Sequence, residues 1–425
     1  MLKHLILCLS ATALAGTALA QEPTAKPPDP TRPGFTDFSS PKPDLNPGQP
    51  IDHRSTELKG DKPAFPGQTR APYVQTAAPK VTLITDQLHS PWGLGFLPDG
   101  KMIVTEKEGK IRIVSQDGAL SAPLSGVPEV LMIKQLGLLD IELDPKFASN
   151  HTIYFTFNEA EDHDTSAIVV GKAKLDEAKL ALTDVNVIFR AKPALPRDHA
   201  VNAGSRITID RQGDLFVSIG DRSQSPPWDY AQKLDNDLGK MIHITPAGKP
   251  APNNPYLHTP GVLPEIWSRG HRTPQGLTIN PATGELWEVE HGPRGGDEIN
   301  QPQAGKNYGW PVIVHGIDYP GDIIGAGITE HAGMEQPLYY WDPVIAPSGL
   351  LFYTGDKFPQ WKNNLFVGGL RSEMVDRIVL DGTKVVSEEP LLLDQHSRIR
   401  DVRQGPEGFI YVLGDNGKLF RLTPQ

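Results

Sequence analysis

The stretch GSRITIDRQGDLFVSIGD, residues 204–221, is typical of a β-hairpin. An apolar strand comes first, a polar turn that contains Gly follows, and the second strand is rich in Leu, Phe, Val and Ile. Such runs on both sides of a Gly-containing turn predict two paired strands. Related hairpins recur at 92–106, 136–158, 275–292, 348–370 and 399–415.

Six hairpins in one chain favour a fold built by radial repetition of small antiparallel sheets. We therefore expect an all-β protein whose residues 79–425 form a six-bladed β-propeller of four-stranded antiparallel blades. A β-sandwich with many hairpins is the alternative, but a domain of about 350 residues is large for that architecture.

The bulk composition excludes several classes of partner. The chain has 425 residues and a formal net charge of −10, which does not favour binding to nucleic acid. Beyond the N-terminus no run of 18 or more residues is apolar, so we expect no membrane span.

The first residues predict export. Residues 1–20 carry Lys3, an apolar stretch and the cleavage pattern Ala18-Leu19-Ala20, as in a secretory signal peptide. We expect the protein in the bacterial periplasm or outside the cell. The single cysteine, Cys8, lies inside this segment, so the mature chain has no disulfide. Residues 21–78 are rich in Pro and predict an extended arm or linker, partly disordered.

Residues 267–311, WSRGHRTPQGLTINPATGELWEVEHGPRGGDEINQPQAGKNYGWP, concentrate charged residues on a frame of glycines and prolines. Gly and Pro at this density fix the backbone, and charged side chains on a rigid frame indicate a small-molecule or metal site.

Polar residues stand at matching places around the predicted hairpins, where propeller loops meet near the central axis. They are Gln135, His199, Asn202, Asp221, Arg272, Arg371, Arg398 and Arg400. Four of them are arginines, which pair well with carboxylates, so the expected ligand carries several negative charges. Simpler roles remain open: Asp221 as a turn cap, Arg371 as a surface residue, and Arg398 and Arg400 in ion pairs between blades.

The chain resembles the soluble pyrroloquinoline-quinone (PQQ) sugar dehydrogenases, in particular their aldose sugar dehydrogenase branch. The matching strings include KQLGLLDIELDPKF, LGKMIHITPAG, PEIWSRGHRTPQGL, EHGPRGGDEIN, GKNYGWP and RIRDVRQGPEGFIYVL. They extend over nearly all of residues 79–425. The resemblance implies oxidation of the C1 hydroxyl of an aldose to a lactone, with hydride transfer to PQQ and later electron transfer to an unknown acceptor.

The resemblance also implies roles for single residues. Arg272 would polarise the quinone carbonyl, and Gln135 and Asn202 would lie beside PQQ. Arg371, Arg398 and Arg400 would bind its carboxylates. The backbone carbonyls of Gly292 and Pro293 would hold a calcium ion that bridges to PQQ. Glu298 and the Tyr308 carbonyl resemble a second calcium site, although Glu298 has a simpler alternative in a salt bridge to Arg294 or Lys306.

One position departs from the family pattern. The family places its catalytic base in H-x-G-[GS]-R, and here the string is Asn202-Ala203-Gly204-Ser205-Arg206. An amide takes no proton at neutral pH, so we expect His199, three residues earlier, to be the base and Asp221 to orient it. Two rivals stay open: a calcium-dependent propeller that binds a sugar or a protein without catalysis, and a calcium lactonase without a quinone.

Overall fold

The computed structural model describes residues 43–223 and 228–425. The predicted signal peptide lies outside the described residues. These described residues belong to one compact unit. Its described part is almost entirely β-structure, arranged in six antiparallel sheets that succeed one another along the chain, apart from β1.

Blades 1 to 3 are formed by residues 91–269. Blade 1 contains β2 (Pro91–Phe96), β3 (Met102–Glu106) and β4 (Lys110–Val114). Blade 2 contains β5 (Leu138–Leu143), β6 (Thr152–Ala160), β7 (Thr165–Asp176) and β8 (Ala181–Arg190), and β9 (Leu195–Pro196) pairs with β7. Blade 3 contains β10 (Gly204–Ile209), β11 (Leu215–Ile219), β12 (Lys240–Ile244) and β13 (Ile266–Arg269).

Blades 4 to 6 complete the ring. Blade 4 contains β14 (Pro274–Ile279), β15 (Leu286–Glu290), β16 (Asp297–Asn300) and β17 (Tyr339–Trp341). Blade 5 contains β18 (Pro347–Phe352), β19 (Leu365–Gly369), β20 (Val375–Asp381) and β21 (Lys384–Leu391). Blade 6 contains β22 (Ile399–Gln404), β23 (Ile410–Gly414), β24 (Leu419–Thr423) and β1 (Lys80–Thr85).

Helical segments in the described residues are short and lie between strands. They are the α-helix α1 (Phe147–Asn150) and the 3-10 helices η1 (Asp229–Gln232), η2 (Pro359–Trp361) and η3 (Leu393–Gln395). Among the residues that the structure places, no helix has the length and apolar character needed to cross a bilayer.

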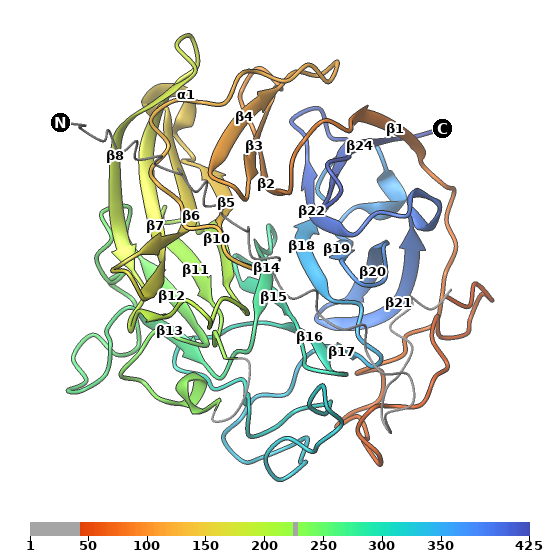
Figure 1. The fold of residues 1–425 in the computed structure, drawn as a ribbon. Helices are drawn as coiled ribbons and strands as arrows, with labels where there is room; N and C mark the ends of the chain where they lie inside the picture. Colours follow the sequence, from red (N-terminus) through yellow and green to blue (C-terminus); the bar gives the residue numbers. More distant parts are fainter. Residues whose placement is uncertain (1–42, 224–227) are drawn as a thin grey trace, which may run out of the picture. The chain divides into compact units, whose positions relative to one another are not determined.

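The six sheets form a propeller. The innermost strands β2, β5, β10, β14, β18 and β22 each pack against the next one in this order, and β22 packs against β2 (Figure 1). Each predicted hairpin supplies the two inner strands of one blade. The prediction of a six-bladed β-propeller is therefore confirmed. The predicted number of four strands per blade is found in blades 3 to 6. Blade 1 has three strands, and blade 2 has β9 in addition to its four.

The ring is closed by strands from opposite ends of the sequence. Strand β1 pairs antiparallel with β24, and Val81 lies opposite Leu422. Blade 6 thus combines three C-terminal strands with one strand that precedes blade 1. Hydrogen bonds rather than chain connectivity hold this blade to the start of the propeller.

Every innermost strand has a register shift near its first residues, as in β2 between Pro91 and Leu94. A bulge bends a strand and redirects its side chains. The third residues of these strands are Asp140, Arg206 and Asp401 in blades 2, 3 and 6, and Gly93, Gly276 and Gly349 in blades 1, 4 and 5.

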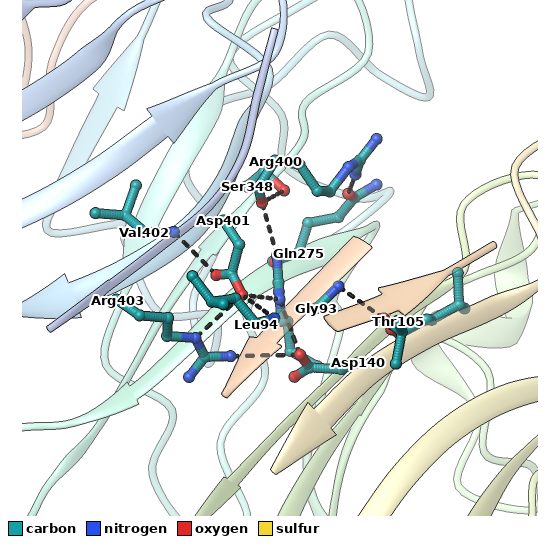
Figure 2. Close-up of polar contacts among 12 residues, drawn as sticks. Gly93, Leu94, Thr105, Asp140, Gln275, Ser348, Arg400, Asp401, Val402 and Arg403 are labelled. Atoms are coloured by element: carbon teal, nitrogen blue, oxygen red, sulfur yellow. Dashed lines mark hydrogen bonds and ion pairs between the residues drawn. The ribbon is translucent and has the colours of Figure 1, made fainter. Parts of the chain in front are cut away.

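The three charged residues meet in a buried cluster, and Figure 2 shows Asp140 and Asp401 in it. Arg206 Nη1 lies 2.9 Å from Asp140 Oδ1 and 3.1 Å from Asp401 Oδ2. Arg206 Nε and Nη2 also donate to the carbonyls of Gln275 and Arg400. A Cβ at Gly349 would come within 2.6 Å of Asp401 Oδ1, so the neighbouring blade needs glycine there. Leu94 N in blade 1 also donates to Asp401 Oδ2. The hydrogen bonds and ion pairs of this cluster therefore join blades 1, 2, 3, 4 and 6.

Candidate active site

A cavity lies where the loops of blades 2, 3 and 4 meet, and it contains about 610 Å³ of open space. The described residues that line it are Gln135, Val201, Asn202, Ser223, Trp228, Arg272, Pro293, Trp310, Asp318 and Tyr319. Four residues predicted from the sequence are among them: Gln135, Asn202, Arg272 and Pro293.

Arg272 lies two residues before Pro274, the first residue of β14, and it is only 7% exposed. Its Nη1 donates to Gly292 O at 2.8 Å and to His291 O at 3.1 Å. The guanidinium also lies over the Trp310 ring, 5.3 Å from its centroid. Arg272 Nε is buried without a hydrogen-bond partner among the described residues. The side chain is therefore held in place and retains one donor for a ligand.

Asn202 forms part of a buried network behind the cavity wall. Its Nδ2 donates to Asp221 Oδ1 at 2.8 Å, and its backbone N–H donates to Gln135 Oε1 at 2.8 Å. The other oxygen of Asp221 accepts from Trp310 Nε1 at 2.7 Å. Burial raises the pKa of Asp221, while Arg272 and the amide of Asn202 oppose this rise. Asp221 thus orients two residues that face the cavity.

His199 occupies a different position on the same loop. It is not one of the described residues that line the cavity, whereas Asn202 is. The His199 carbonyl accepts two hydrogen bonds from the Arg222 guanidinium, and His199 Nδ1 is buried without a hydrogen-bond partner in the described part of the chain. Asp221, which we expected to orient the base, accepts a hydrogen bond from Asn202. His199 remains a predicted base, and its side chain would have to move to reach the cavity.

The predicted arginines of blade 6 pair within their own blade. Arg400 Nε lies 2.7 Å from Asp415 Oδ1, and Arg398 Nε lies 3.3 Å from Asp415 Oδ2. Arg400 Nη1 also donates to Gln275 Oε1 at 2.7 Å, which links it to blade 4. Arg398 Nη1 donates to the carbonyl of Leu370, next to Arg371.

These arginines influence one half-buried histidine, His291. Burial and then the nearby charges of Arg272, Arg400 and Arg398 lower the pKa of His291 to about 3. Arg371 lies near Asp297, which in turn is close to Arg272. The four arginines therefore gather around the loop of residues 290–297 and create a positive field there.

Asp297 holds this loop in place through hydrogen bonds to backbone groups. Its carboxylate accepts hydrogen bonds from the backbone N–H groups of Gly292, Ile345 and Ala346. Burial raises the pKa of Asp297 to about 7, although these donors oppose the rise. At Gly292 a Cβ would lie 2.3 Å from the carbonyl oxygens of Gly295 and Gly296, so only glycine fits the turn.

The predicted metal residues border a second, adjoining cavity of about 260 Å³ of open space. Its lining includes Gly292, Pro293, Glu298 and Tyr308, and it shares Arg272 with the first cavity. The salt bridges considered for Glu298 are made elsewhere, since Lys306 lies 2.9 Å from Glu335 and Arg294 Nε lies 2.8 Å from Glu57. Glu298 instead accepts a hydrogen bond from Asn300 Nδ2 at 3.0 Å.

Half-buried Glu298 belongs to an acidic cluster with the buried Glu288 and Glu290. His271 Nδ1 lies 2.8 Å from Glu288 and 3.5 Å from Glu290. Burial raises the pKa of Glu288 to about 7; burial opposes protonation of His271, but the carboxylates raise its pKa to about 10. Three carboxylates beside one imidazole leave excess negative charge, and hard oxygen ligands suit calcium.

The sequence analysis missed His271 and Glu288 in this cluster and Trp310 and Tyr319 in the cavity wall. A signal was present for Glu288. In the strand LWEVE, residues 286–290, Glu288 and Glu290 share one face, and all five residues are buried. Acidic residues on the face of a central strand indicate a site.

A further cavity, with about 540 Å³ of open space, lies beside β17 and residues 50–54. None of the residues predicted for the site lines it among the described residues.

The sequence profile of the Glucose / Sorbosone dehydrogenase family matches residues 88–421. The chain belongs to the glucose/sorbosone dehydrogenase family. It is an oxidoreductase of this family, which confirms the resemblance found in the sequence.

Several relatives of this family are similar over most of their length. Aldose sugar dehydrogenase YliI of Escherichia coli K12 is 42% identical over 353 residues, which cover 82% of this chain and 94% of that protein. The crystal structure of the soluble E. coli aldose sugar dehydrogenase in its apo form has a TM-score of 0.77 and 42% identity, with coverage of 81% and 99%. The PQQ-bound aldose sugar dehydrogenase of Streptomyces coelicolor has a TM-score of 0.66 and 27% identity, with coverage of 82% and 99%.

Proposed function

We propose that this protein is an exported quinoprotein that oxidises the C1 hydroxyl of aldoses to lactones by hydride transfer to PQQ. The observation that supports this most strongly is the cavity in which Arg272, fixed by the Gly292 carbonyl, faces the amides of Gln135 and Asn202. The PQQ-bound relative from Streptomyces coelicolor and the aldose sugar dehydrogenase from E. coli support the choice of cofactor and substrate class.

The residues present fit the cofactor. PQQ is a planar polycarboxylate, and the unpartnered Nε of Arg272 and the positive field around His291 suit such an anion. Arg371, Arg398 and Arg400 would bind its carboxylates, and Gln135 and Asn202 would contact it. When bound, PQQ supplies a quinone carbonyl that accepts hydride.

The protein contributes orientation, polarisation and proton transfer. Arg272 would polarise the accepting oxygen with a guanidinium that is already fixed before the reaction. Asp221 would hold Asn202 and Trp310 in place against the bound ligands. His199 is the proposed base that takes the proton of the sugar hydroxyl.

Two calcium ions complete the proposal. The carbonyls of Gly292 and Pro293 would hold one ion, and Glu298 with the Tyr308 carbonyl would hold the second. The carboxylates of Glu290 and Glu298 line the adjoining cavity with Glu288 close to them, and this cluster of acidic groups supports a cation there. Export by residues 1–20 and an electron acceptor outside the protein belong to the same proposal.

A dye-reduction assay tests the function. The purified protein should reduce an electron-accepting dye with glucose or another aldose only when both PQQ and calcium are added, and the product should be the lactone. Hydrolysis of a lactone with calcium alone would instead favour the lactonase.

A binding propeller is the second candidate, and Asn202 is the observation that favours it. Asn202 lines the cavity at the position where the family has its base, and both protons of its amide are used in hydrogen bonds to Asp221 and the Ser223 carbonyl. Sugar binding by calorimetry without turnover in any dye assay would support this candidate.

Calcium removal should lower the thermal stability of the protein. An ion that binds only the folded state stabilises it by about 2.7 kcal/mol at 100 times its Kd, so a chelator should lower Tm and added calcium should restore it. Circular dichroism melts with and without chelator measure the effect, with magnesium as the comparison ion. An unchanged Tm would show that at least one of the two calcium assignments is wrong.

A further inference from the structure

Residues 43–79, called here the docked segment, precede the part of the chain that matches the family profile. The segment lies along the outer edges of blades 4 and 5. Tyr340 N in β17 donates to Gln68 O at 2.8 Å, and Val74 N donates to Glu388 O in β21 at 3.0 Å. Its residues Ile51, Ala71 and Tyr73 belong to the buried core of these blades. The segment is therefore part of the folded unit.

Two acidic side chains of the docked segment reach the loops of the candidate active site. Glu57 Oε2 lies 2.8 Å from Arg294 Nε, and Asp61 Oδ1 lies 3.0 Å from His315 Nδ1. The side chains of Arg294 and His315 are 7% and 2% exposed. Glu57 and Arg294 form a largely buried ion pair, and Asp61 and His315 share a buried hydrogen bond, so loss of one partner is costly.

Arg294 belongs to the loop of residues 292–296, and His315 belongs to a second loop segment that packs against it. The backbone groups of Arg294 and Ile317 exchange two hydrogen bonds, of 3.0 and 2.9 Å. A Cβ at Gly296 would lie 2.9 Å from the carbonyl carbon of His315, so the two segments are in close contact. Gly295 and Gly296 have φ values of 94° and 72°, which other residues rarely adopt.

The same loop ends at the cavity. Gly292 O accepts the hydrogen bond from Arg272 Nη1, and Pro293 lines both cavities. Contacts therefore run without a gap from Glu57 and Asp61 through Arg294 and His315 to the carbonyl that fixes Arg272. A displacement of about 1 Å at a catalytic group is enough to lower a rate 100-fold.

We propose that the docked segment is a positioning element for the active site, in which Glu57 and Asp61 are positioning residues that hold the loop of residues 292–296 in its binding shape. The catalytic consequence rests on the proposed function, whereas the effect on the loop does not.

Hydrogen exchange of the full chain, without added cofactor or metal, tests this inference. In Glu57→Gln and Asp61→Asn the amides of residues 292–297 should exchange about 10-fold faster or more than in the unsubstituted protein, because the loop loses a buried charged contact. Both substitutions keep the size of the side chain. If Asp61→Asn does not fold, Glu57→Gln alone decides.

Thr76→Val is the matched control. Thr76 anchors the docked segment to Glu389 and Trp361, at contacts that do not involve residues 292–296. In Thr76→Val the amides of residues 292–297 should exchange at the same rate as in the unsubstituted protein. In all variants the amides of the core strand β19 should also exchange at the unsubstituted rate. Unchanged loop exchange in Glu57→Gln, an equal rise in Thr76→Val, or an equal rise in β19 would overturn the proposal.

In the loaded enzyme Glu57→Gln should lower kcat with little change in KM for the sugar, and Glu57→Asp should restore part of it. Faster loop exchange in a protein that oxidises no sugar would leave the positioning role intact and reject only the proposed function.

Discussion

Alanine at position 199 should lower kcat for aldose oxidation by about 10²–10⁴-fold, the usual effect of losing a general base, and leave PQQ binding largely unchanged. His199 and Asn202 lie three residues apart on one loop, and only the imidazole can accept a proton, because an amide is not basic at neutral pH. Steady-state kinetics and a PQQ titration of the same variant measure the two effects separately.

Asn202→His is the companion experiment. Asn202 lines the cavity with φ of 49°, a conformation that His tolerates better than most residues, so the exchange should leave the backbone unchanged. Activity should rise if position 202 is where the base acts. Full activity in His199→Ala would place the base elsewhere, and no activity in either the unsubstituted protein or Asn202→His would favour the binding propeller.

Arg206→Met should lower the free energy of unfolding by about 3–5 kcal/mol, because it removes the fully buried arginine that pairs with Asp140 and Asp401 and leaves these buried carboxylates only Arg403. Arg206 is 1% exposed and contacts Asp140 and Asp401 at the axis, where its guanidinium also lies 4.1 Å from the centroid of the Trp92 ring. Denaturant titration followed by circular dichroism gives the value.

Arg190→Met serves as its control. Arg190 pairs with Glu159 at 2.7 Å, but its side chain is 52% exposed, and exposed pairs contribute about 0–1 kcal/mol. A loss in Arg206→Met no larger than in Arg190→Met would mean that the axial cluster does not stabilise the ring.

The fold could be predicted because its signals are local. Each inner hairpin has its turn residues between two apolar strands, so a short window of sequence contains the information. The outer strands were harder to predict. Strand β1 pairs with β24 from the far end of the chain, and nothing in KVTLIT specifies that partner.

The candidate site could be predicted where residues recur in register with the hairpins. Gln135, Asn202 and Arg272 were found in this way, Pro293 was found through the resemblance to the family, and all four line one cavity. The contacts of Glu57 with Arg294 and of Asp61 with His315 could not be found, because they join a Pro-rich segment to loops more than 230 residues away. Composition alone indicated an extended arm, since Pro content describes a segment's own stiffness and not its partner.

The pairing of β1 with β24 has a consequence for folding kinetics. The two strands lie more than 330 residues apart in the sequence, so their pairing closes a loop that contains blades 1 to 5. The entropic cost of closing a loop grows with its length, and pairing between distant strands is slow for this reason. We therefore expect the ring to close late in folding, after the hairpins of the single blades have formed.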